Sequence, residues 1–375
     1  MKNCRVLHIL VCLGTGGVET LLLNFQKHLP EHVQFDYLVA QNDIRDAEAE
    51  KYGSRIFVIP NDKKTPWKHP GLVTELIEQH RYRVVHFHRF AFGGAILKTA
   101  KELGVPVRVA HSHNTGFQES GFFNLLYSAY HKTVNRFQLQ RYATHILACS
   151  NKAGRFLMGP LWNRGAKCRR LLNGIELEKF SGESTPEIRR SLCERYGIPP
   201  DAIVIGNLGR LMPAKNQAFL IRIFTELAAR NPRYVLFIGG EGELRGELER
   251  QVEQLGLTNR VFMPGFCTNP AELLVNLFDV FCLPSLSEGF PVSLPEAAAS
   301  GLFSVYSKNV TQELVELLPD SMLSLPLDAS PGRWADALED GINRRVPPER
   351  GRQLVGNQSL TIEAMLEALL KIYES

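Results

Sequence analysis

Short β-rich runs alternate along this chain with longer segments of helical periodicity, and this alternation limits the fold more than any other feature. It is typical of βαβ units built around parallel sheets. In the first half we expect strands at residues 5–10, 34–39, 55–59, 84–88, 107–111 and 146–148, and helices at 18–28, 70–79 and 122–141. In the second half we expect strands at 203–208, 234–239, 261–263, 280–283 and 303–306, and helices at 217–229, 243–255, 271–276, 293–300 and 311–317.

The alternation breaks once, at residues 181–200, where Ser, Gly and Pro interrupt both patterns. A chain of 375 residues also exceeds what one hydrophobic core usually supports. We therefore predict an α/β protein of two facing, doubly wound, Rossmann-like domains, at residues 1–175 and 176–355. A last segment, 356–375, holds an amphipathic helix. Ligands of open α/β sheets bind beyond the carboxyl ends of the strands, so the expected site is an interdomain cleft.

Composition indicates an ordinary folded protein, with 44% apolar and 22% charged residues. The seven cysteines are odd in number and form no CxxC pair or zinc spacing, which favours reduced thiols. The first apolar run is short and leads into glycines rather than a cleavage site, and no apolar stretch reaches the roughly 18 residues of a membrane span. We expect a cytoplasmic protein.

Charge is distributed unevenly despite a net value of only +4. Residues 121–175 contain no Asp or Glu but nine Lys or Arg, and Phe122, Phe123, Tyr127 and Tyr130 lie near their start. Such one-sided charge attracts anions, and together with the aromatics it indicates a peripheral patch for an anionic membrane surface. An ordinary basic surface is the alternative. Nucleic acid would also fit the charge, but no recognisable nucleic-acid module is present, so we expect none.

A glycine-rich loop, Leu13-Gly14-Thr15-Gly16-Gly17-Val18-Glu19-Thr20, joins the first strand to the first helix. Glycines let the backbone approach an anion, and a helix N-terminus offers free N–H groups. The loop matches neither the dinucleotide fingerprint nor a Walker A loop, because Glu19 occupies the third glycine position of the former. It is either an anion-binding loop through Gly16 and Gly17 or a tight turn without a ligand.

Two histidine couples, His86-Phe87-His88 and His111-Ser112-His113, end neighbouring predicted strands. Residues two apart on a strand share a face, so each couple can converge on one ligand. Three interpretations remain: a metal site, structural histidines bonded to backbone, or a substrate contact. No carboxylate cluster accompanies the couples, so we expect no metal. His113 is the favoured substrate contact because a loop follows it.

Two cations follow the first strand of the second half, in Gly209-Arg210-Leu211-Met212-Pro213-Ala214-Lys215-Asn216. A strand end that leads into a helix start is where a diphosphate is well stabilised. Arg210 offers a planar fork of donors and Lys215 a compact point charge. A solvated charged loop is the alternative interpretation.

The most specific motif holds two carboxylates eight residues apart, Glu288 and Glu296. A carboxylate can accept two hydroxyl hydrogen bonds at once, which suits vicinal diols of ribose or of a sugar. The residues that follow Glu288 expose backbone N–H groups ahead of a helix and are suited to phosphate or sugar oxygens: Gly289, Phe290, Pro291 and Val292. The alternative is a surface Glu288 and a Glu296 that merely favours the helix dipole.

In order along the chain, these motifs resemble the family-4 retaining glycosyltransferases of GT-B fold, in particular those that build bacterial exopolysaccharide, capsule or O-antigen. The resemblance spans nearly the whole chain, with Glu288 to Glu296 as the family's E-x7-E. The other matching segments are Gly16-Gly17-Val18-Glu19-Thr20, Phe35-Asp36-Tyr37-Leu38-Val39, Ala110-His111-Ser112-His113-Asn114, Asn173-Gly174-Ile175, Gly209-Arg210, Lys215-Asn216 and Val310-Thr311-Gln312-Glu313.

The resemblance implies an acceptor-binding first domain, a donor-binding second domain and a last helix that crosses back to the first. It implies that Arg210 and Lys215 hold the donor diphosphate and stabilise the leaving group. Glu296 would bind the ribose and Glu288 hydroxyls of the donor sugar.

Three further positions take roles from the resemblance. The Gly16-Gly17 loop would close over phosphates or acceptor, and His113 would contact the sugar near its anomeric carbon. Phe266 would lie beside the base.

The implied partners are a nucleotide-sugar, UDP-linked by family habit, and a lipid-linked or oligosaccharide acceptor. We expect transfer with retention, no cofactor and no metal, because no Asp-x-Asp motif offers a metal clamp and fixed cations can take its place. A GT-B epimerase or phosphorylase, or a non-catalytic nucleotide-sugar binding protein, is the alternative. The sequence leaves the sugar, acceptor and linkage open.

Overall fold

The computed structural model describes residues 4–14, 16–59, 69–88, 93–116, 128–162 and 164–375. The chain divides into two compact units. Unit 1 comprises residues 1–174 together with 362–375, and unit 2 comprises residues 175–361. Each is an α/β unit around its own parallel sheet. Among the described residues, no helix combines the length and apolar character needed to cross a bilayer.

Unit 1 contains a seven-stranded sheet of order β3-β2-β1-β4-β5-β6-β7. Its strands are β1 (Cys4–Ile9), β2 (Val33–Val39), β3 (Ile56–Val58), β4 (Val84–Phe87), β5 (Val107–Ser112), β6 (His145–Ala148) and β7 (Cys168–Arg170). All paired strands run parallel. Most are buried runs of β-branched or large apolar residues, as expected for strands covered on both faces.

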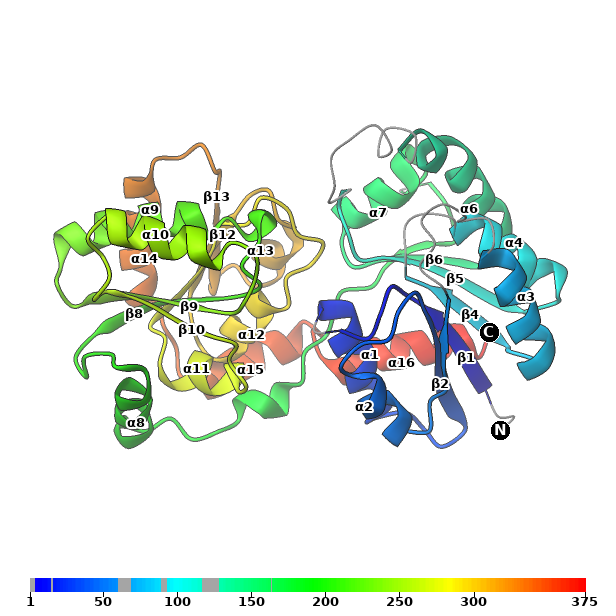
Figure 1. Cartoon of the computed structure of the whole chain (residues 1–375), viewed down its shortest axis with the longest axis horizontal. Helices are drawn as coiled ribbons and strands as arrows, with labels where there is room; N and C mark the ends of the chain where they lie inside the picture. Colours follow the sequence, from blue (N-terminus) through cyan, green and yellow to red (C-terminus); the bar gives the residue numbers. More distant parts are fainter. Residues whose placement is uncertain (1–3, 15, 60–68, 89–92, 117–127, 163) are drawn as a thin grey trace. The chain divides into compact units, whose positions relative to one another are not determined.

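Helices cover both faces of this sheet (Figure 1). Helix α1 packs against α2 and α16, and α4 packs against α3 and α6. Their bounds are α1 (Gly17–Gln26), α2 (Asp46–Lys51), α3 (His69–His80), α4 (Gly93–Glu102), α6 (Arg136–Tyr142), α7 (Asn151–Met158) and α16 (Ile362–Tyr373), with a π-helical turn η2 (His131–Asn135) before α6 and a 3-10 turn η3 (Gly159–Leu161) after α7. The predicted helix at 122–141 falls partly outside the described residues.

The C-terminal helix α16 belongs to unit 1. Its buried side chains recur at helical spacing and join the core formed by β1, β2 and α1. They are Ile362, Met365, Leu366, Leu369, Ile372 and Tyr373. This apolar stripe explains why a segment that follows unit 2 in the chain completes the core of unit 1.

Unit 2 contains a six-stranded parallel sheet of order β10-β9-β8-β11-β12-β13. Its strands are β8 (Ile203–Leu208), β9 (Tyr234–Gly239), β10 (Val261–Gly265), β11 (Val280–Leu283), β12 (Ser304–Ser307) and β13 (Met322–Leu325). The helices are α8 (Pro186–Tyr196), α9 (Gln217–Arg230), α10 (Arg245–Gln254), α11 (Pro270–Asn276), α12 (Ser293–Ala299), α13 (Glu313–Leu317), α14 (Pro331–Ile342) and α15 (Pro348–Asn357), with 3-10 turns η4 (Leu177–Phe180) and η5 (Pro213–Lys215).

In both sheets the strand order reverses direction beside the first strand of the unit. The reversal falls between β1 and β4 in unit 1 and between β8 and β11 in unit 2. Loops that leave two such strands diverge to opposite sides and open a crevice at the carboxyl edge, which is where doubly wound sheets bind ligands. A site is therefore expected in the loops that follow β1 and β4 in unit 1 and β8 and β11 in unit 2.

Candidate active site

Two loops meet at the reversal point of unit 2, residues 209–216 after β8 and 284–292 after β11. They are tied by two hydrogen bonds: Leu286 N–H donates to the Ala214 carbonyl at 2.8 Å, and the Asn216 side-chain amide donates to the Pro284 carbonyl at 3.0 Å. Asn216 has φ of 57°, a left-handed conformation that Asn tolerates better than most residues. Helix α9 begins immediately after it.

The cation and the carboxylate of these loops face each other. Lys215 Nζ lies 2.6 Å from Glu288 Oε1, and Ser285 Oγ donates to the same oxygen at 2.8 Å. The side chains are 20% exposed for Lys215 and 14% exposed for Glu288. Two residues predicted separately, 73 positions apart, thus form one partly buried charged pair.

Arg210 differs from Lys215 in its surroundings. Its residue is exposed, and within the described parts of the chain no carboxylate lies within ion-pair distance of its guanidinium. Its carbonyl accepts a hydrogen bond from the Gln217 amide at 3.0 Å, which holds the backbone against the start of α9. The loop therefore offers one paired ammonium and one guanidinium available to an anion.

Glycines bring the loops after β8, β9 and β10 into close stacking, a feature the sequence analysis missed. Gly240 has φ of 141°, a conformation that side-chain-bearing residues rarely adopt. Its N–H donates to the Gly265 carbonyl at 2.8 Å, and a Cβ on it would collide with the Gly209 carbonyl. The consecutive glycines at the end of β9 are the signal that could have revealed this contact.

Glu296 lies in the first turn of α12 and is half-buried. Burial raises the pKa of its carboxyl to about 7, an effect that Lys179 opposes and Glu176 reinforces. Lys179 and Glu176 pair with each other at 2.5 Å beside η4, which packs against α12. The sequence analysis did not connect this pair with Glu296, since nothing in their spacing indicates the contact.

The remaining residues that were predicted to bind the nucleotide-sugar differ in their exposure to solvent. Phe266 follows β10 and is 68% exposed, whereas Phe290 and Pro291 are buried and Gly289 and Val292 are partly exposed. Phe290 therefore anchors its loop by packing. A large exposed aromatic such as Phe266 is available to a ligand.

In unit 1 the predicted glycine loop leads into α1, with Thr15 outside the described residues. Gly16 is the N-cap of α1, and a Cβ on it would collide with the Glu19 carboxylate. Gly17 has open space where a Cβ would be. A side chain on Gly16 would therefore require the Glu19 carboxylate to move.

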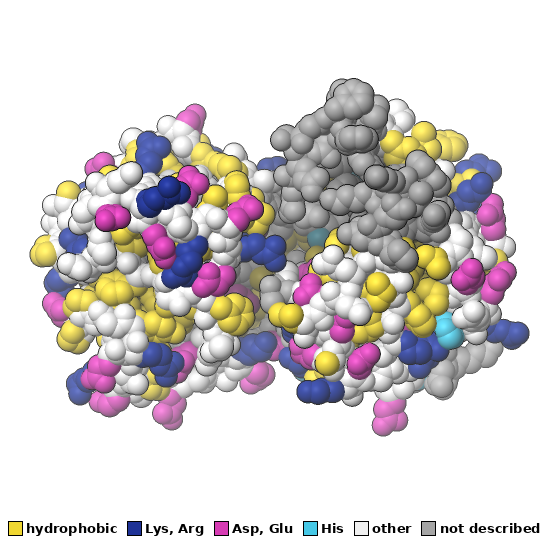
Figure 2. Space-filling model, in the orientation of Figure 1, with side chains coloured by type: hydrophobic (Ala, Val, Ile, Leu, Met, Phe, Trp, Pro, Cys, Tyr) yellow, Lys and Arg dark blue, Asp and Glu magenta, His cyan; other side chains and the backbone are white. Residues whose placement is uncertain are grey.

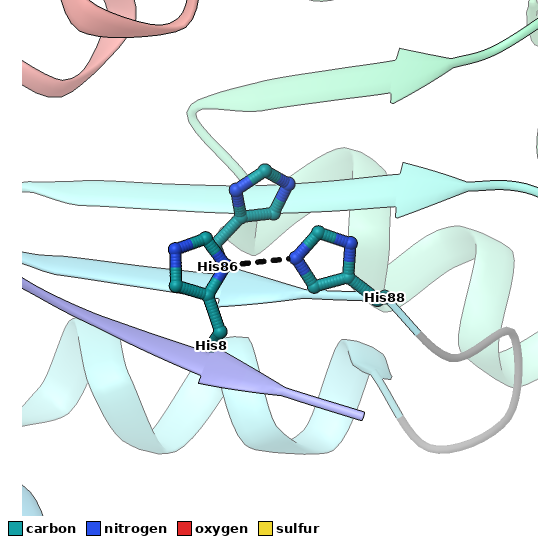
Figure 3. A group of neighbouring side chains, drawn as sticks. All are labelled: His8, His86 and His88. Atoms are coloured by element: carbon teal, nitrogen blue, oxygen red, sulfur yellow. Dashed lines mark hydrogen bonds between the residues drawn. The ribbon is translucent and has the colours of Figure 1, made fainter. Parts of the chain in front are cut away.

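Within the described parts of the chain, the histidine couples bond to other side chains and not, as one interpretation had it, to the backbone. All four imidazoles are buried and hydrogen-bonded to other side chains, and His8 of β1 joins them. Two groups of three bring candidate ligand nitrogens within 4.8 Å of one another: His8, His86 and His88, and His88, His111 and His113. Figure 3 shows the first group, with the His8–His88 hydrogen bond dashed.

Comparison with known proteins gives two family matches. Residues 15–179 match the model of Glycosyltransferase Family 4, and residues 189–316 match that of Glycosyl transferases group 1. The putative glycosyltransferase EpsF of Bacillus subtilis is 35% identical over 348 residues, which cover 89% of this chain and 86% of the relative.

Two further matches add an activity and a fold. An Escherichia coli UDP-Gal:alpha-D-GlcNAc-diphosphoundecaprenol alpha-1,3-galactosyltransferase is 27% identical over 238 residues, or 62% of this chain and 59% of the relative. The crystal structure of Anabaena HepE in complex with UDP and glucose superposes with a TM-score of 0.78 at 18% identity, covering 99% of this chain and all of that one. The latter likeness establishes the fold.

Proposed function

Because this chain belongs to the family-4 glycosyltransferases and has their GT-B fold, we propose that it transfers a sugar, with retention, from a UDP-sugar to a lipid-linked or oligosaccharide acceptor of cell-surface polysaccharide. The observation that carries this proposal is the cation arrangement at the reversal point of unit 2. There Lys215 is held by Glu288, and Arg210 has no acidic partner among the described residues.

These cations supply what the departure of a nucleoside diphosphate requires. One further negative charge develops on the leaving diphosphate as its bond to the sugar breaks, and fixed donors aimed at this charge act without reorganisation. The positive end of α9, a helix of 14 residues, begins beside Lys215 and adds to the same field. Arg210, Lys215 and this helix end together can carry the role of a metal clamp, so the proposed transfer is metal-independent.

The carboxylates supply the contacts to hydroxyl groups. Glu288 is oriented by Lys215 and Ser285, and its carboxylate would accept a hydrogen bond from a hydroxyl of the donor sugar. Glu296 would accept from the ribose, a role that requires its ionised form. Phe266, exposed after β10, would lie against the uracil.

Two observations support a lipid-linked acceptor at a membrane: the name of a relative and the positive charge of one surface of unit 1. The Escherichia coli relative is named for a diphosphoundecaprenol acceptor. Described residues of the acid-free stretch expose Val134 and Phe137 one turn apart, beside exposed Lys132 and Arg141. On the face of unit 2 visible in Figure 2, by contrast, basic and acidic side chains are interspersed. An anionic membrane surface fits the basic and apolar face on unit 1.

The membrane contact is tested by flotation with liposomes of neutral and of anionic lipid. We expect binding that requires anionic lipid and weakens when Phe137 and Val134 are both replaced by Ser. Leu255→Ser, which removes a comparably exposed apolar side chain of unit 2, is the matched control. Binding that ignores lipid charge would reject this localisation. The aromatics Phe122, Phe123 and Tyr127, which the sequence pattern also assigned to this patch, lie outside the described residues.

The transfer itself is tested in two steps. A thermal-shift screen of nucleotide-sugars identifies the donor as the one that stabilises most. NMR of the product formed with that donor then reports whether the anomeric configuration is retained. Inversion, or activity that EDTA abolishes and added divalent metal restores, would contradict the proposal.

A further inference from the structure

Five buried histidines gather on three adjacent strands of unit 1. His8 lies on β1, His86 lies on β4 with His88 directly after it, and His111 lies on β5 with His113 directly after it. The parallel register pairs His8 with His86. The family resemblance implies a role for His113 alone, so the other four imidazoles need an explanation.

Three of them form a continuous chain of hydrogen bonds. His8 Nδ1 lies 2.9 Å from His88 Nε2, and His88 Nδ1 lies 3.0 Å from His113 Nε2. The middle ring, His88, therefore uses both of its nitrogens, and His8 and His113 each use one (Figure 3 shows the first link). The hydrogen-bonded chain begins near the carboxyl end of β1, among the rings of Phe35 and Tyr37, and ends beyond the carboxyl end of β5.

A second, separate chain runs beside the first. The Tyr373 hydroxyl of α16 lies 2.6 Å from His86 Nδ1, and His86 Nε2 lies 3.3 Å from His111 Nδ1. The two chains touch by ring contact, with centroids 4.1 Å apart for His86 and His88 and 4.0 Å apart for His111 and His113. The two histidines of each couple thus lie in contact but belong to different hydrogen-bonded chains.

The ring geometry favours hydrogen bonds over a shared metal ion. The ring centroids are 5.2 Å apart for His8 and His88, and again for His88 and His113. Each separation exceeds the corresponding nitrogen–nitrogen distance by about the width of one imidazole, so the two nitrogens lie on the line between the ring centres. Rings that turned their lone pairs onto one ion at these nitrogen separations would bring their centres closer together.

Proton counting then couples the three rings. A neutral imidazole has one donor and one acceptor nitrogen, so two N–H···N bonds force His8, His88 and His113 into the same tautomer. One donor and one acceptor are left at the two ends. His8 Nε2 and His113 Nδ1 are those ends, and both are buried without a partner among the described residues. Burial lowers the pKa of His8 and of His113 to about 3, which keeps the chain neutral.

We propose that His8, His88 and His113 form a tautomer-coupled relay in which His8 and His88 are positioning residues and His113 Nδ1 is the ligand-facing atom, for a sugar hydroxyl. Either tautomer satisfies both internal bonds, so Nδ1 can donate to a hydroxyl or accept from one. A buried nitrogen without a partner is costly, and a hydroxyl that pairs with it recovers that cost. The identity of the ligand rests on the proposed transferase function; the relay itself does not.

The test uses full-length protein with ¹⁵N-labelled histidine rings, whose long-range ¹H–¹⁵N correlations report each tautomer. His8→Leu moves the unpaired inner end of the relay from His8 Nε2 to His88 Nε2. The cost of leaving a donor rather than an acceptor unpaired differs between these two buried places, so we expect the tautomer ratio of His113 to shift by about fivefold, which corresponds to about one hydrogen bond. His111→Leu is the matched control, because His111 stacks on His113 but belongs to the other chain. His111→Leu should change the tautomer ratio of His113 by less than about twofold, a free-energy difference of roughly half that of one hydrogen bond.

A larger shift from His111→Leu than from His8→Leu would show that packing, not the relay, sets His113. Stoichiometric Zn²⁺ binding that His88→Gln abolishes would replace the relay with a metal site. If His8→Leu does not fold, His88→Gln serves instead, because an amide cannot exchange its donor and acceptor by proton transfer and should hold His113 in one tautomer. If the His88→Gln variant keeps the same mixture of His113 tautomers as the unchanged protein, the relay is rejected.

The donor found by thermal shift separates this inference from the proposed function. Donor binding that moves the His113 signals supports Nδ1 as the sugar contact, and donor binding that leaves them unchanged rejects that contact. Failure of every nucleotide-sugar to bind would reject the transferase function, while the His8→Leu result would still decide the relay.

Discussion

The pair of Lys215 and Glu288 can be tested by a double-mutant cycle of Lys215→Met and Glu288→Gln. Its magnitude lies between two limits. Exposed ion pairs contribute about 0–1 kcal/mol, whereas loss of one partner from a buried pair costs about 3–5 kcal/mol. With side chains 20% and 14% exposed and an N–O distance of 2.6 Å, we expect a coupling free energy of about 2 kcal/mol, typical of a hydrogen bond to a charged group.

The cycle is measured by urea unfolding followed by tryptophan fluorescence. Trp334 is fully buried in unit 2, so replacing Trp67 and Trp162 by Phe in all four proteins makes the signal report on that unit. The double variant should be more stable than the sum of the single losses predicts, by the coupling energy. A coupling below about 0.5 kcal/mol would mean that the pair is a solvated contact.

Ligand binding gives the same pair a second, independent signature. Glu288 and a bound diphosphate compete for one ammonium, so Glu288→Gln should bind UDP several-fold tighter while transferring sugar more slowly. Lys215→Met should lower kcat/KM by about 10²–10³-fold, the usual effect of removing a donor from a developing anion. UDP affinity that Glu288→Gln leaves unchanged or weakens would refute the idea that Lys215 binds the diphosphate.

Three further outcomes are expected. Arg210→Ala should lower kcat/KM by about 10²-fold or more yet change the free energy of unfolding by less than about 0.5 kcal/mol, because its side chain is exposed; a large stability loss in urea would contradict this. Glu296 has a folded-state pKa of about 7 against 4.5, so the folded state binds the proton more tightly and loses stability as pH rises from 4.5 through 7. Glu296→Gln should therefore raise Tm at pH 8, with a difference that shrinks toward pH 5, and equal Tm values at pH 8 would refute the shift. Gly240→Ala should destabilise by about 1–3 kcal/mol, whereas Gly246→Ala, at a helical site with open space, should stabilise by about 0.5–1 kcal/mol; chemical denaturation compares them.

The strands predicted most accurately lie inside the sheets, and the two strands that were missed lie at sheet edges. The predicted bounds of β8, β9 and β11 agree with the structure residue for residue, because strands buried on both faces are continuous apolar runs. The edge strands β7 and β13 were missed. The sequence Cys-Arg-Arg of β7 is polar and mostly exposed, so it lacks the apolar run of a buried strand. The strand β13 is apolar at three of its four positions, and its run was not recognised.

The histidine relay shows where reasoning from a single segment ends. Both couples were recognised because residues two apart share a face of one strand. His8 and Tyr373 were not, since each is a lone polar residue within an apolar segment. The strand order β2-β1-β4 places His8 beside His86, so adjacency of the first and fourth strands was the missing information.

The sequence by itself determined the α/β class, the family through its ordered motifs, and the loops after strands where a ligand would bind. These follow from local periodicity and spacing, which each segment carries alone. Only the tertiary structure decided that Lys215 is paired with Glu288, that Glu296 is desolvated, and that three histidines are hydrogen-bonded one to the next. Charge pairing, burial and tautomer depend on which atoms lie a few ångströms away, and those neighbours come from distant parts of the chain.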